Sequence, residues 1–428
     1  MSSNLIPSAK IMNILIIGSG GREHALAWKI KQSPQLKKLF IAPGNAGTAL
    51  LGENVFLDVL NYQVVLAFIK EKDIDLIVIG PDNVLATNLV DFLKQSNVKV
   101  FGPTKEAARI EWSKSFAKEL LKQLAIPTAQ SQVFTDIEKA KNYIRNQTYP
   151  LVIKADGLAL GKGVVIAYTK EEGNRALEEM MEKKSFSEAG EKVVIEEYLE
   201  GEEISMHAFS DGENISLFPP AQDHKRIFDN DKGPNTGGMG TIAPVPAVSQ
   251  DVLNTIEKHF IRPVILELKK RGHPFVGVLF PGIILTKDGP KVLEFNARFG
   301  DPETQSYMRL LQTDLISILI ACVEGRLHEI KIDWSKGAAC TVVLASGGYP
   351  GNYKSGFLIR GVAEAEALKD VVVFHAGTKM ENNQLITNGG RVLGVSATGA
   401  HLEEARKKAY KAVSVINFKD KQYRSDIA

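Results

Sequence analysis

Short apolar runs alternate with amphipathic segments over the first third of the chain. The segments 23–32 and 64–70 have the apolar spacing of helices, whereas the shorter runs end in glycine or proline, as buried strands commonly do. Strands that alternate with helices predict a parallel sheet, and ligands of such sheets bind at the carboxyl ends of the strands. The predicted strands are 13–18, 39–42, 76–80 and 98–102.

The pattern changes after residue 112. Residues 113–124 have helical spacing with a serine at the start, and residues 130–209 mix short strands with helices. The stretch 221–248 is polar and rich in glycine and proline, so we predict a long functional loop there. Beyond it we expect a helix at 249–271, strands near 275–285 and 290–296, helices near 303–325, and a last helix at 402–415.

These changes of pattern predict a multidomain protein of α/β and α+β class. A chain of 428 residues is longer than a single hydrophobic core usually supports. We predict a disordered extension at 1–11, an N-terminal Rossmann-like parallel α/β substrate domain at 12–112, a central domain at 113–336 with a lid subdomain at about 130–195, and a small α+β domain at 337–428.

Composition excludes several classes of protein. The 52 basic and 50 acidic residues nearly balance, which gives no reason to expect a nucleic-acid partner. No apolar run approaches the roughly 20 residues that span a bilayer, and the first eleven residues lack the features of a signal peptide. Cys322 and Cys340 lie far apart, which favours a reducing compartment. We therefore expect a cytoplasmic protein without a membrane partner.

Two glycine-rich turns follow neighbouring predicted strands. The sequence GSGGREH at 18–24 places backbone amides at the start of a helix, where phosphates commonly bind. Glu23 stands where a dinucleotide fingerprint has glycine, so NAD binding fits poorly. PGNAGT at 43–48 ends the next strand, and two such turns suit one phosphorylated sugar. A tight strand–helix turn without a ligand is an equally good interpretation of the first motif alone.

A lysine and a glycine-rich hairpin form the second candidate site. Lys154 leaves a predicted buried strand, and Gly161-Lys162-Gly163 precedes the next. Such a hairpin can fold over phosphates, with Lys154 as a fixed positive charge, although it is not a Walker A loop. A solvated surface hairpin is the alternative.

Acidic residues end a further predicted strand at 196–197, and more acids follow at 202–203. The backbone of such a strand end can contact an adenine ring, and a carboxylate beyond it can bind ribose hydroxyls. Taken alone, the pattern more often marks a charged strand end.

The predicted loop carries Asp223-His224-Lys225-Arg226 and then GPNTGGMG at 233–240. Basic side chains followed by glycines suit anion binding by backbone amides. His224 is a candidate general base, but a lone loop histidine is more often solvated.

The segment 293–303 has the clearest chemistry. Glu294 and Asn296 are two residues apart on a predicted strand, so both side chains face the same side. A carboxylate and an amide oxygen are ligands that magnesium prefers when it carries nucleotide phosphates. Arg298 follows on the same face and could stabilise a transferring phosphoryl group. Asp301 and Glu303 follow at a turn, where each could contact substrate or support Arg298.

Taken together, these motifs resemble those of the phosphoribosylamine–glycine ligases, a family of the ATP-grasp superfamily. The resemblance runs from Met12 almost to the last residue and implies an N-terminal pre-ATP-grasp domain and a central ATP-grasp domain. The remaining motifs that carry it are SKSFAK at 113–118, SGGYPG at 346–351, GGRVLGV at 389–395 and YRSDI at 423–427.

The resemblance implies a reaction. Glycine would be joined to 5-phosphoribosylamine through a glycyl phosphate, with ATP and Mg²⁺ or Mn²⁺, in the second step of de novo purine synthesis. The family pattern implies metal ligands at Glu294 and Asn296, and catalytic roles for Arg298, Asp223 and Lys225. It implies ATP contacts at Lys114, Lys154, Gly161, Gly163, Glu196, Glu197, Leu199 and Glu203. It implies substrate contacts at Gly20, Gly21, Arg22, Asn45, Gly47, Asn235, Thr236, Gly237, Gly238 and Asp301. The expected partners are the two small substrates, and we expect a monomer.

The chain departs from the family pattern in places. Asp82-Asn83-Val84-Leu85 replaces a segment that usually begins with glutamate, Asn88 and Trp112 stand where glycine is common, and Pro281 replaces alanine. Another ATP-grasp carboxylate–amine ligase or a carboxylase subunit is the first alternative, but residues 278–284 lack the extra acid of biotin carboxylases. An oxidoreductase and a non-catalytic nucleotide-binding protein are further alternatives.

Overall fold

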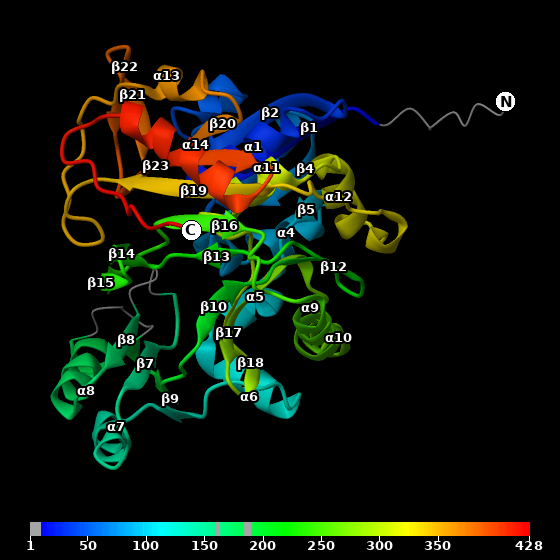
Figure 1. Ribbon diagram of the computed structural model, residues 1–428. Coiled ribbons are helices and arrows are strands. Elements are labelled where there is room, and N and C mark those ends of the chain that lie inside the picture. Colours follow the sequence, from blue (N-terminus) through cyan, green and yellow to red (C-terminus); the bar gives the residue numbers. More distant parts are fainter. Residues whose placement is uncertain (1–9, 97, 159–162, 184–189) are drawn as a thin grey trace.

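Figure 1 shows the computed structural model, which describes residues 10–96, 98–158, 163–183 and 190–428. Residues 1–9 of the extension predicted at 1–11, together with Gly161 and Lys162, lie outside the described residues. No helix in the described part of the chain has the length and apolar character to cross a bilayer.

The first domain is built on a parallel sheet, as the sequence predicted, and a short fifth strand, β3, joins the four predicted strands. Every residue of β1 is buried, because helices cover both faces of the sheet and the apolar run Ile14–Ile17 has no solvent-facing side. The strands, in sheet order, are β3 (Glu53–Asn54), β2 (Leu36–Pro43), β1 (Met12–Gly18), β4 (Ile74–Ile79) and β5 (Lys99–Phe101). The helices are α1 (Gly21–Ile30), α2 (Tyr62–Glu71), α3 (Asp82–Leu85), α4 (Leu89–Lys94) and α5 (Lys105–Trp112), with a 3-10 turn η1 at Thr48–Leu50.

After α6 (Lys114–Gln123) the chain forms a small antiparallel sheet at the lower left of Figure 1. Its strands are β6 (Ser131–Phe134), β9 (Val193–Glu197), β7 (Leu151–Ala155) and β8 (Val164–Ala167), in sheet order. The helices α7 (Ile137–Ile144) and α8 (Lys170–Leu177), with the π-helical turn η2 (Glu178–Glu182), pack on one side of it. Phe134, Ile153 and Ile195 belong to a core of their own, so this subdomain has an independent hydrophobic centre.

A second antiparallel sheet carries the predicted metal residues. Its strands are β10 (Glu202–Ser205), β17 (Val276–Thr286), β11 (Ala208–Asp211) and β12 (Ile215–Leu217), and β18 (Gly289–Asn296) pairs with β17. Gly282 lies opposite Glu294 and Phe280 lies opposite Asn296. The helical stretch α9 (Gln250–Ile256), η4 (Glu257–Ile261) and α10 (Arg262–Lys270) packs against this region. It spans almost the same residues as the helix predicted at 249–271.

The prediction of a long loop at 221–248 was wrong. This stretch contains β13 (Gln222–Asp223), β14 (Arg226–Phe228), β15 (Lys232–Asn235) and β16 (Gly240–Ala243). β14 and β15 pair as a hairpin, and β16 pairs with β19 (Ala338–Ala345), almost 100 residues further along the chain. Because the pairing partner of β16 is so distant, the local composition of the stretch gave no sign of a strand.

The third sheet therefore joins the central and C-terminal parts of the chain. Its order is β13, β16, β19, β23 (Arg391–Gly399) and β20 (Val371–His375). The helix α14 (Leu402–Val415) contacts β19 and β23, and Figure 1 shows it above the sheet in red. The other elements are α11 (Glu303–Leu310), α12 (Leu315–Val323), the 3-10 turn η5 (Leu327–Glu329), α13 (Val362–Glu366), β21 (Thr378–Glu381) and β22 (Gln384–Thr387).

Candidate active site

A cavity of about 850 Å³ lies between the small lid sheet and the sheet that carries β18. It collects residues that are far apart in the sequence, and these include every predicted ATP-binding, catalytic and metal residue that the structure describes. The predicted residues that line it are Lys114, Lys154, Gly163, Glu196, Glu197, Leu199, Glu203, Asp223, Lys225, Asn235, Thr236, Gly237, Glu294, Asn296, Arg298 and Asp301. Gly238, Gly20, Gly21, Arg22, Asn45 and Gly47 are not among its lining residues.

Glu294 and Asn296 both line the cavity, as their alternate positions on β18 require. Burial alone would raise the pKa of Glu294, but Lys225, Lys154 and Lys114 outweigh burial and hold the pKa below its usual value. Glu294 is therefore a carboxylate at neutral pH. A hard divalent cation takes oxygen ligands of this kind and completes its coordination with phosphates and water, so the pair fits magnesium.

Arg298 lies directly beside the predicted metal pair. Its Nη2 donates to Asn296 Oδ1 at 3.1 Å, and its Nε lies 3.2 Å from Glu111 Oε1. Burial opposes the charge on Arg298, but Glu111 and Asp82 raise its pKa above the usual value. Glu111 also accepts the backbone N–H of Ala297 at 2.7 Å. Glu111 was missed from the sequence, because nothing near it in α5 indicates a contact with β18.

Glu196 links two buried lysines on the lid side of the cavity. Its Oε2 lies 3.1 Å from both Lys118 Nζ and Lys154 Nζ. Burial lowers the pKa of Lys118 to about 8, although Glu196 opposes that change. Lys154 also donates to the carbonyl of Leu293 at 3.1 Å, next to Glu294. The predicted phosphate-binding lysine is therefore fixed between the lid sheet and β18.

Asp223, Lys225, Glu203 and Glu303 form a charged cluster on the opposite wall. Lys225 Nζ lies 2.8 Å from Glu203 Oε2, and this contact, with Glu294 nearby, raises the pKa of Lys225 against the effect of burial. Burial and the neighbouring Glu303 raise the pKa of Asp223 well above its usual value. Asp223 Oδ1 is buried without a hydrogen-bond partner. A carboxyl group with a raised pKa and a free oxygen is suited to accept a proton.

His224, the other loop candidate, is held by the chain itself. Its Nδ1 lies 3.2 Å from the carbonyl oxygen of Gly240, and burial lowers its pKa. The imidazole is therefore bonded within the protein, between β13 and β16, although His224 also lines the cavity.

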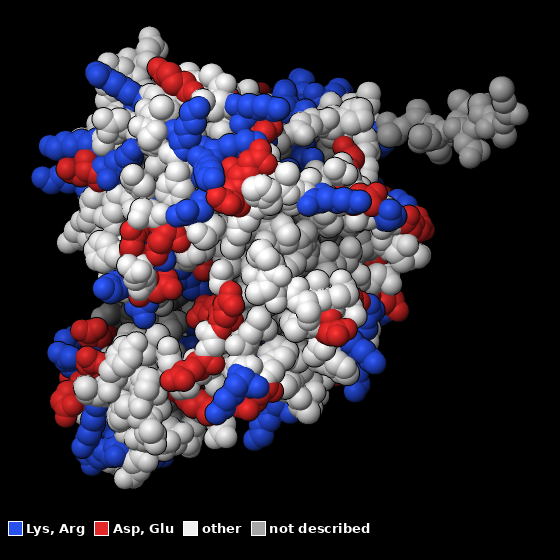
Figure 2. All heavy atoms as spheres, in the orientation of Figure 1, with Lys and Arg blue, Asp and Glu red and all other residues white. Residues whose placement is uncertain are grey.

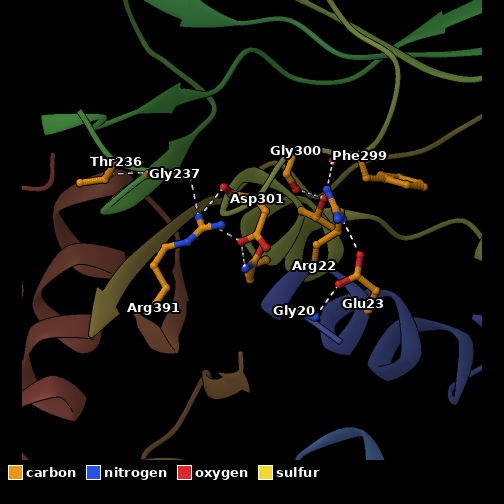
Figure 3. Close-up of polar contacts among 12 residues, drawn as sticks. Gly20, Arg22, Glu23, Thr236, Gly237, Phe299, Gly300, Asp301 and Arg391 are labelled. Atoms are coloured by element: carbon orange, nitrogen blue, oxygen red, sulfur yellow. Dashed lines mark hydrogen bonds and ion pairs between the residues drawn. The ribbon is translucent and has the colours of Figure 1, made fainter. Parts of the chain in front are cut away.

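The turn at Gly20–Arg22 contacts the segment 293–303 through Arg22 (Figure 3). The backbone N–H of Gly20 donates to Glu23 Oε2 at 2.6 Å, and Arg22 Nε pairs with Glu23 Oε1 at 2.6 Å. Arg22 Nη1 also donates to the carbonyl of Phe299 at 3.2 Å. Asp301 stands so close that a side chain at Gly20 would lie 3.2 Å from its Oδ2. The backbone N–H of Gly20, a predicted phosphate donor, is thus already bonded to Glu23. Asp301 lies beside this turn and also lines the cavity.

Asn45 faces the protein. Its Nδ2 donates to the carbonyls of Ser19 and His375, each at 2.8 Å, and its Oδ1 accepts the amides of Gly47 and Thr48. Both donors and the acceptor of the side chain are therefore engaged. Asn45 shapes the turn after β2 and ties it to the C-terminal domain.

Arg391, a residue missed from the sequence, reaches the site from the start of β23. Its Nη1 donates to the carbonyl oxygens of Gly237 and Asp301, each at 2.6 Å, and lies 3.4 Å from Asp301 Oδ1 (Figure 3). Tyr349 adds a hydrogen bond from the Gly237 amide to its hydroxyl, at 3.0 Å. The C-terminal domain therefore fixes both the 236–240 turn and the turn at Asp301.

The departures from the family pattern fall beside the site. Asp82 begins α3 and lines the cavity with Glu111 and Arg298. Trp112 ends α5, where the guanidinium of Arg109 lies 5.9 Å from its ring. Pro281 pairs opposite Phe295 and its carbonyl still accepts the amide of Met206 at 3.2 Å, so the strand pairing of β17 and β18 tolerates proline.

A small antiparallel lid, a second sheet with the predicted metal pair, and a charged cavity between them define the protein as an ATP-grasp ligase. Figure 2 shows acidic and basic side chains intermingled over the visible face, without one dominant sign.

Models of the Phosphoribosylglycinamide synthetase N domain, ATP-grasp (A) domain and C domain match residues 12–111, 112–304 and 339–428. The chain belongs to the phosphoribosylglycinamide synthetase family, and the predicted three-domain fold is confirmed.

Individual relatives agree with the family match. The chain is 45% identical to a phosphoribosylamine–glycine ligase of Caldanaerobacter subterraneus subsp. tengcongensis, over 97% of this chain and 99% of that one. It is 49% identical to the trifunctional purine biosynthetic protein adenosine-3 of Gallus gallus, of which it spans only 42%.

A crystal structure of the Thermotoga maritima phosphoribosylamine–glycine ligase matches with a TM-score of 0.84 and 36% identity, covering 97% of this chain and 100% of that one. A biotin carboxylase domain from Hydrogenobacter thermophilus, at 16% identity and a TM-score of 0.74, covers 97% of this chain and 92% of that one and shares the fold.

Proposed function

We propose that the protein joins glycine to 5-phosphoribosylamine, with ATP as the energy source, to give glycinamide ribonucleotide, ADP and phosphate. The observation that carries this proposal is the single cavity that gathers the metal pair Glu294 and Asn296, the lysines Lys114 and Lys154, and the basic residue Lys225. Family membership and the names of the relatives support the same reaction.

In the first step, a carboxylate oxygen of glycine attacks the γ-phosphorus of ATP, and ADP leaves with the bridging oxygen. Lys114, Lys154 and Arg298 stabilise the negative charge that is spread over the transferring group. Glu294 and Asn296 would hold Mg²⁺ or Mn²⁺, which neutralises charge on the ATP phosphates when bound. Glu197, Leu199 and Glu203 hold the adenine and ribose.

In the second step, the amine nitrogen of 5-phosphoribosylamine attacks the carbonyl carbon of the glycyl phosphate. A C–N bond forms, the C–O bond to phosphate breaks, and its electron pair leaves with the phosphate. The nitrogen loses one proton, which Asp223 accepts, while Lys225 stabilises the developing negative charge. Most of the catalysis is then positioning and charge stabilisation, and no covalent enzyme intermediate is needed.

The test is a coupled assay of ADP formation on the wild type, on Glu294→Ala and on a matched control, Glu213→Ala. Glu213 pairs with Lys269 on the surface and does not line the cavity. We expect ADP only when glycine, 5-phosphoribosylamine and a divalent metal are all present, loss of activity in Glu294→Ala, and normal activity in the control. Full turnover by Glu294→Ala, or turnover without glycine, would refute the proposal.

A second set of assays separates this reaction from other ATP-grasp chemistry. Replacing glycine by alanine, β-alanine or bicarbonate should abolish ADP formation if glycine is the acid activated. Turnover with bicarbonate would instead indicate a carboxylase. We further propose that the protein acts as a monomer in the cytoplasm, and sedimentation analysis would reveal a larger assembly.

A further inference from the structure

The motif YRSDI at 423–427 has no part in the proposed chemistry, yet its residues bind the hairpin formed by β14 and β15. Arg424 Nη1 lies 2.6 Å from Asp231 Oδ1 and donates to the carbonyl of Arg226 at 3.2 Å. The side chain of Arg424 is only 2% exposed. A buried guanidinium is costly unless it is paired, so these contacts are specific.

The residues after Arg424 hold the tip of the same hairpin. The backbone N–H of Ser425 donates to Asp229 Oδ1 at 2.8 Å, and the backbone N–H of Asn230 donates to Asp426 Oδ2 at 2.7 Å. Asp426 in turn accepts from Arg424 Nε at 2.7 Å. The hairpin tip and the C-terminal segment therefore each donate a backbone N–H to a side-chain carboxylate of the other.

The tip has the backbone of a tight hairpin turn. Asn230 and Asp231 have φ angles of 57° and 51°, in the left-handed region that asparagine and aspartate adopt more readily than other non-glycine residues. The bonds to residues 425 and 426 add to this local preference and fix where the tip lies against the C-terminal segment.

The end of the segment is hydrogen-bonded to α14. The backbone N–H of Ile427 donates to the hydroxyl of Tyr410 at 3.0 Å, and Arg406 Nε donates to the carbonyl of Ile427 at 3.0 Å. Both partners lie on α14. Ile427 is fully buried, and a side chain at Gly240 would lie 2.7 Å from it. Residues 424–427 therefore connect α14 to the β14–β15 hairpin through direct hydrogen bonds.

The hairpin itself forms part of the cavity wall. Arg226, Asp231 and Asn235 line the cavity that Glu294 and Arg298 also line, whereas Arg424, Ser425 and Asp426 do not. We propose that Arg424, Ser425, Asp426 and Ile427 are positioning residues that hold the β14–β15 hairpin, and with it Lys225 immediately before β14, in place at the cavity wall. This proposal rests on the proposed function for the role of Lys225 and for the identity of the acid substrate, which is glycine.

The first test measures the hairpin itself, without substrate. Hydrogen exchange of peptides that cover 226–240 is compared among wild type, Arg424→Ala, Asp229→Ala and the control Lys408→Ala. Lys408 forms ion pairs with Asp370 and Glu404 in the same domain, away from the hairpin. We expect faster exchange at 226–240 in the first two variants and no change in the control. Asp229 is only half-buried, unlike Arg424, so Asp229→Ala remains informative if Arg424→Ala fails to fold.

The second test separates positioning from general destabilisation. We expect Arg424→Ala to raise the KM for glycine ~10-fold and to lower kcat, with the KM for ATP nearly unchanged, because the ATP-binding residues lie on other elements. Arg424→Lys should restore part of the effect, since lysine supplies the charge without the planar fork.

Two outcomes would overturn the proposal. One is unchanged exchange at 226–240 in both variants. The other is faster exchange there with kinetic constants for glycine equal to those of the wild type. If the wild type itself forms no ADP with glycine, the proposed function fails, whereas the exchange measurement still decides whether the segment holds the hairpin.

Discussion

Arg298 donates from Nη2 to the side-chain oxygen of Asn296, at 3.1 Å. An amide oxygen has two lone pairs, so Asn296 can accept this bond and still face a metal ion. The same guanidinium is paired with Glu111 through Nε at 3.2 Å, and both side chains are largely buried. Arg298 therefore orients the predicted metal ligand Asn296 while it is itself oriented from α5.

We expect Arg298→Lys to reduce kcat by ~10²–10³-fold, the range observed when one stabilising donor is removed from a reacting centre. Lysine keeps the positive charge but cannot bind Asn296 and Glu111 at the same time. The KM for ATP should change little, because the nucleotide contacts lie elsewhere. Steady-state ADP formation at saturating substrate checks this prediction, and a kcat like that of the wild type would contradict it.

Glu111 should act through Arg298. We expect Glu111→Gln to lower kcat by ~10-fold, because the guanidinium loses its charged anchor and the Ala297 amide loses a carboxylate partner. Both substitutions weaken the same ion pair. We therefore expect the loss of kcat in the double variant Glu111→Gln/Arg298→Lys, expressed as a free energy, to be smaller than the sum of the two single losses. Fully additive effects in the double-mutant cycle would show that Glu111 acts independently of Arg298.

The ion pairs of Glu196 should dominate the stability of the lid. Glu196→Ala leaves Lys118 and Lys154 buried without their carboxylate, and breaking a buried pair in this way costs about 3–5 kcal/mol. We expect a lower free energy of unfolding in urea and weaker binding of ATP. The control is Glu200→Ala, since Glu200 is exposed on the same strand–turn segment. Equal stability of the two variants would count against the prediction.

The sequence predicted those parts of the site that depend on local geometry. Glu294 and Asn296 share one face because strand side chains alternate, and the structure brings both to the cavity. The glycine-rich turns after β1 and β2 and four of the five strands of the first sheet were likewise visible as local patterns.

Contacts between distant segments could not be predicted. Arg424 and Asp231 are 193 residues apart, and Arg391 and Gly237 are 154 residues apart. No spacing rule connects such positions. The same limit applies to Asn45. The sequence predicts a substrate contact there, whereas in the structure its side-chain amide donates to the carbonyl oxygen of His375 in the C-terminal domain.

Two buried histidines should make the junction between the first and last domains sensitive to acid. Burial, with a contribution from His375, lowers the pKa of His24 to about 3, and burial lowers the pKa of His375 to about 4. The backbone N–H of His375 donates to His24 Nδ1 at 2.7 Å, so this nitrogen must be unprotonated. The junction therefore requires neutral His24.

The sign of the effect follows from proton binding. Between the unfolded pKa of about 6.5 and the lower folded values, the unfolded chain binds protons that the folded chain does not. Stability is therefore fully present above about pH 6.5 and is lost as the pH falls below it. At pH 5 each histidine should cost about 2 kcal/mol relative to neutral pH. Urea unfolding at pH 7 and pH 5 measures this difference.

His24→Asn provides the decisive comparison. Asparagine can still accept the His375 amide through its side-chain oxygen but does not titrate, so we expect the variant to lose about 2 kcal/mol less than the wild type between pH 7 and pH 5. His259→Asn, at an exposed position, serves as the control and should leave the pH dependence unchanged. If His24→Asn loses as much stability as the wild type over this interval, acid destabilisation arises at other residues, and the junction is not the pH-sensitive part of the fold.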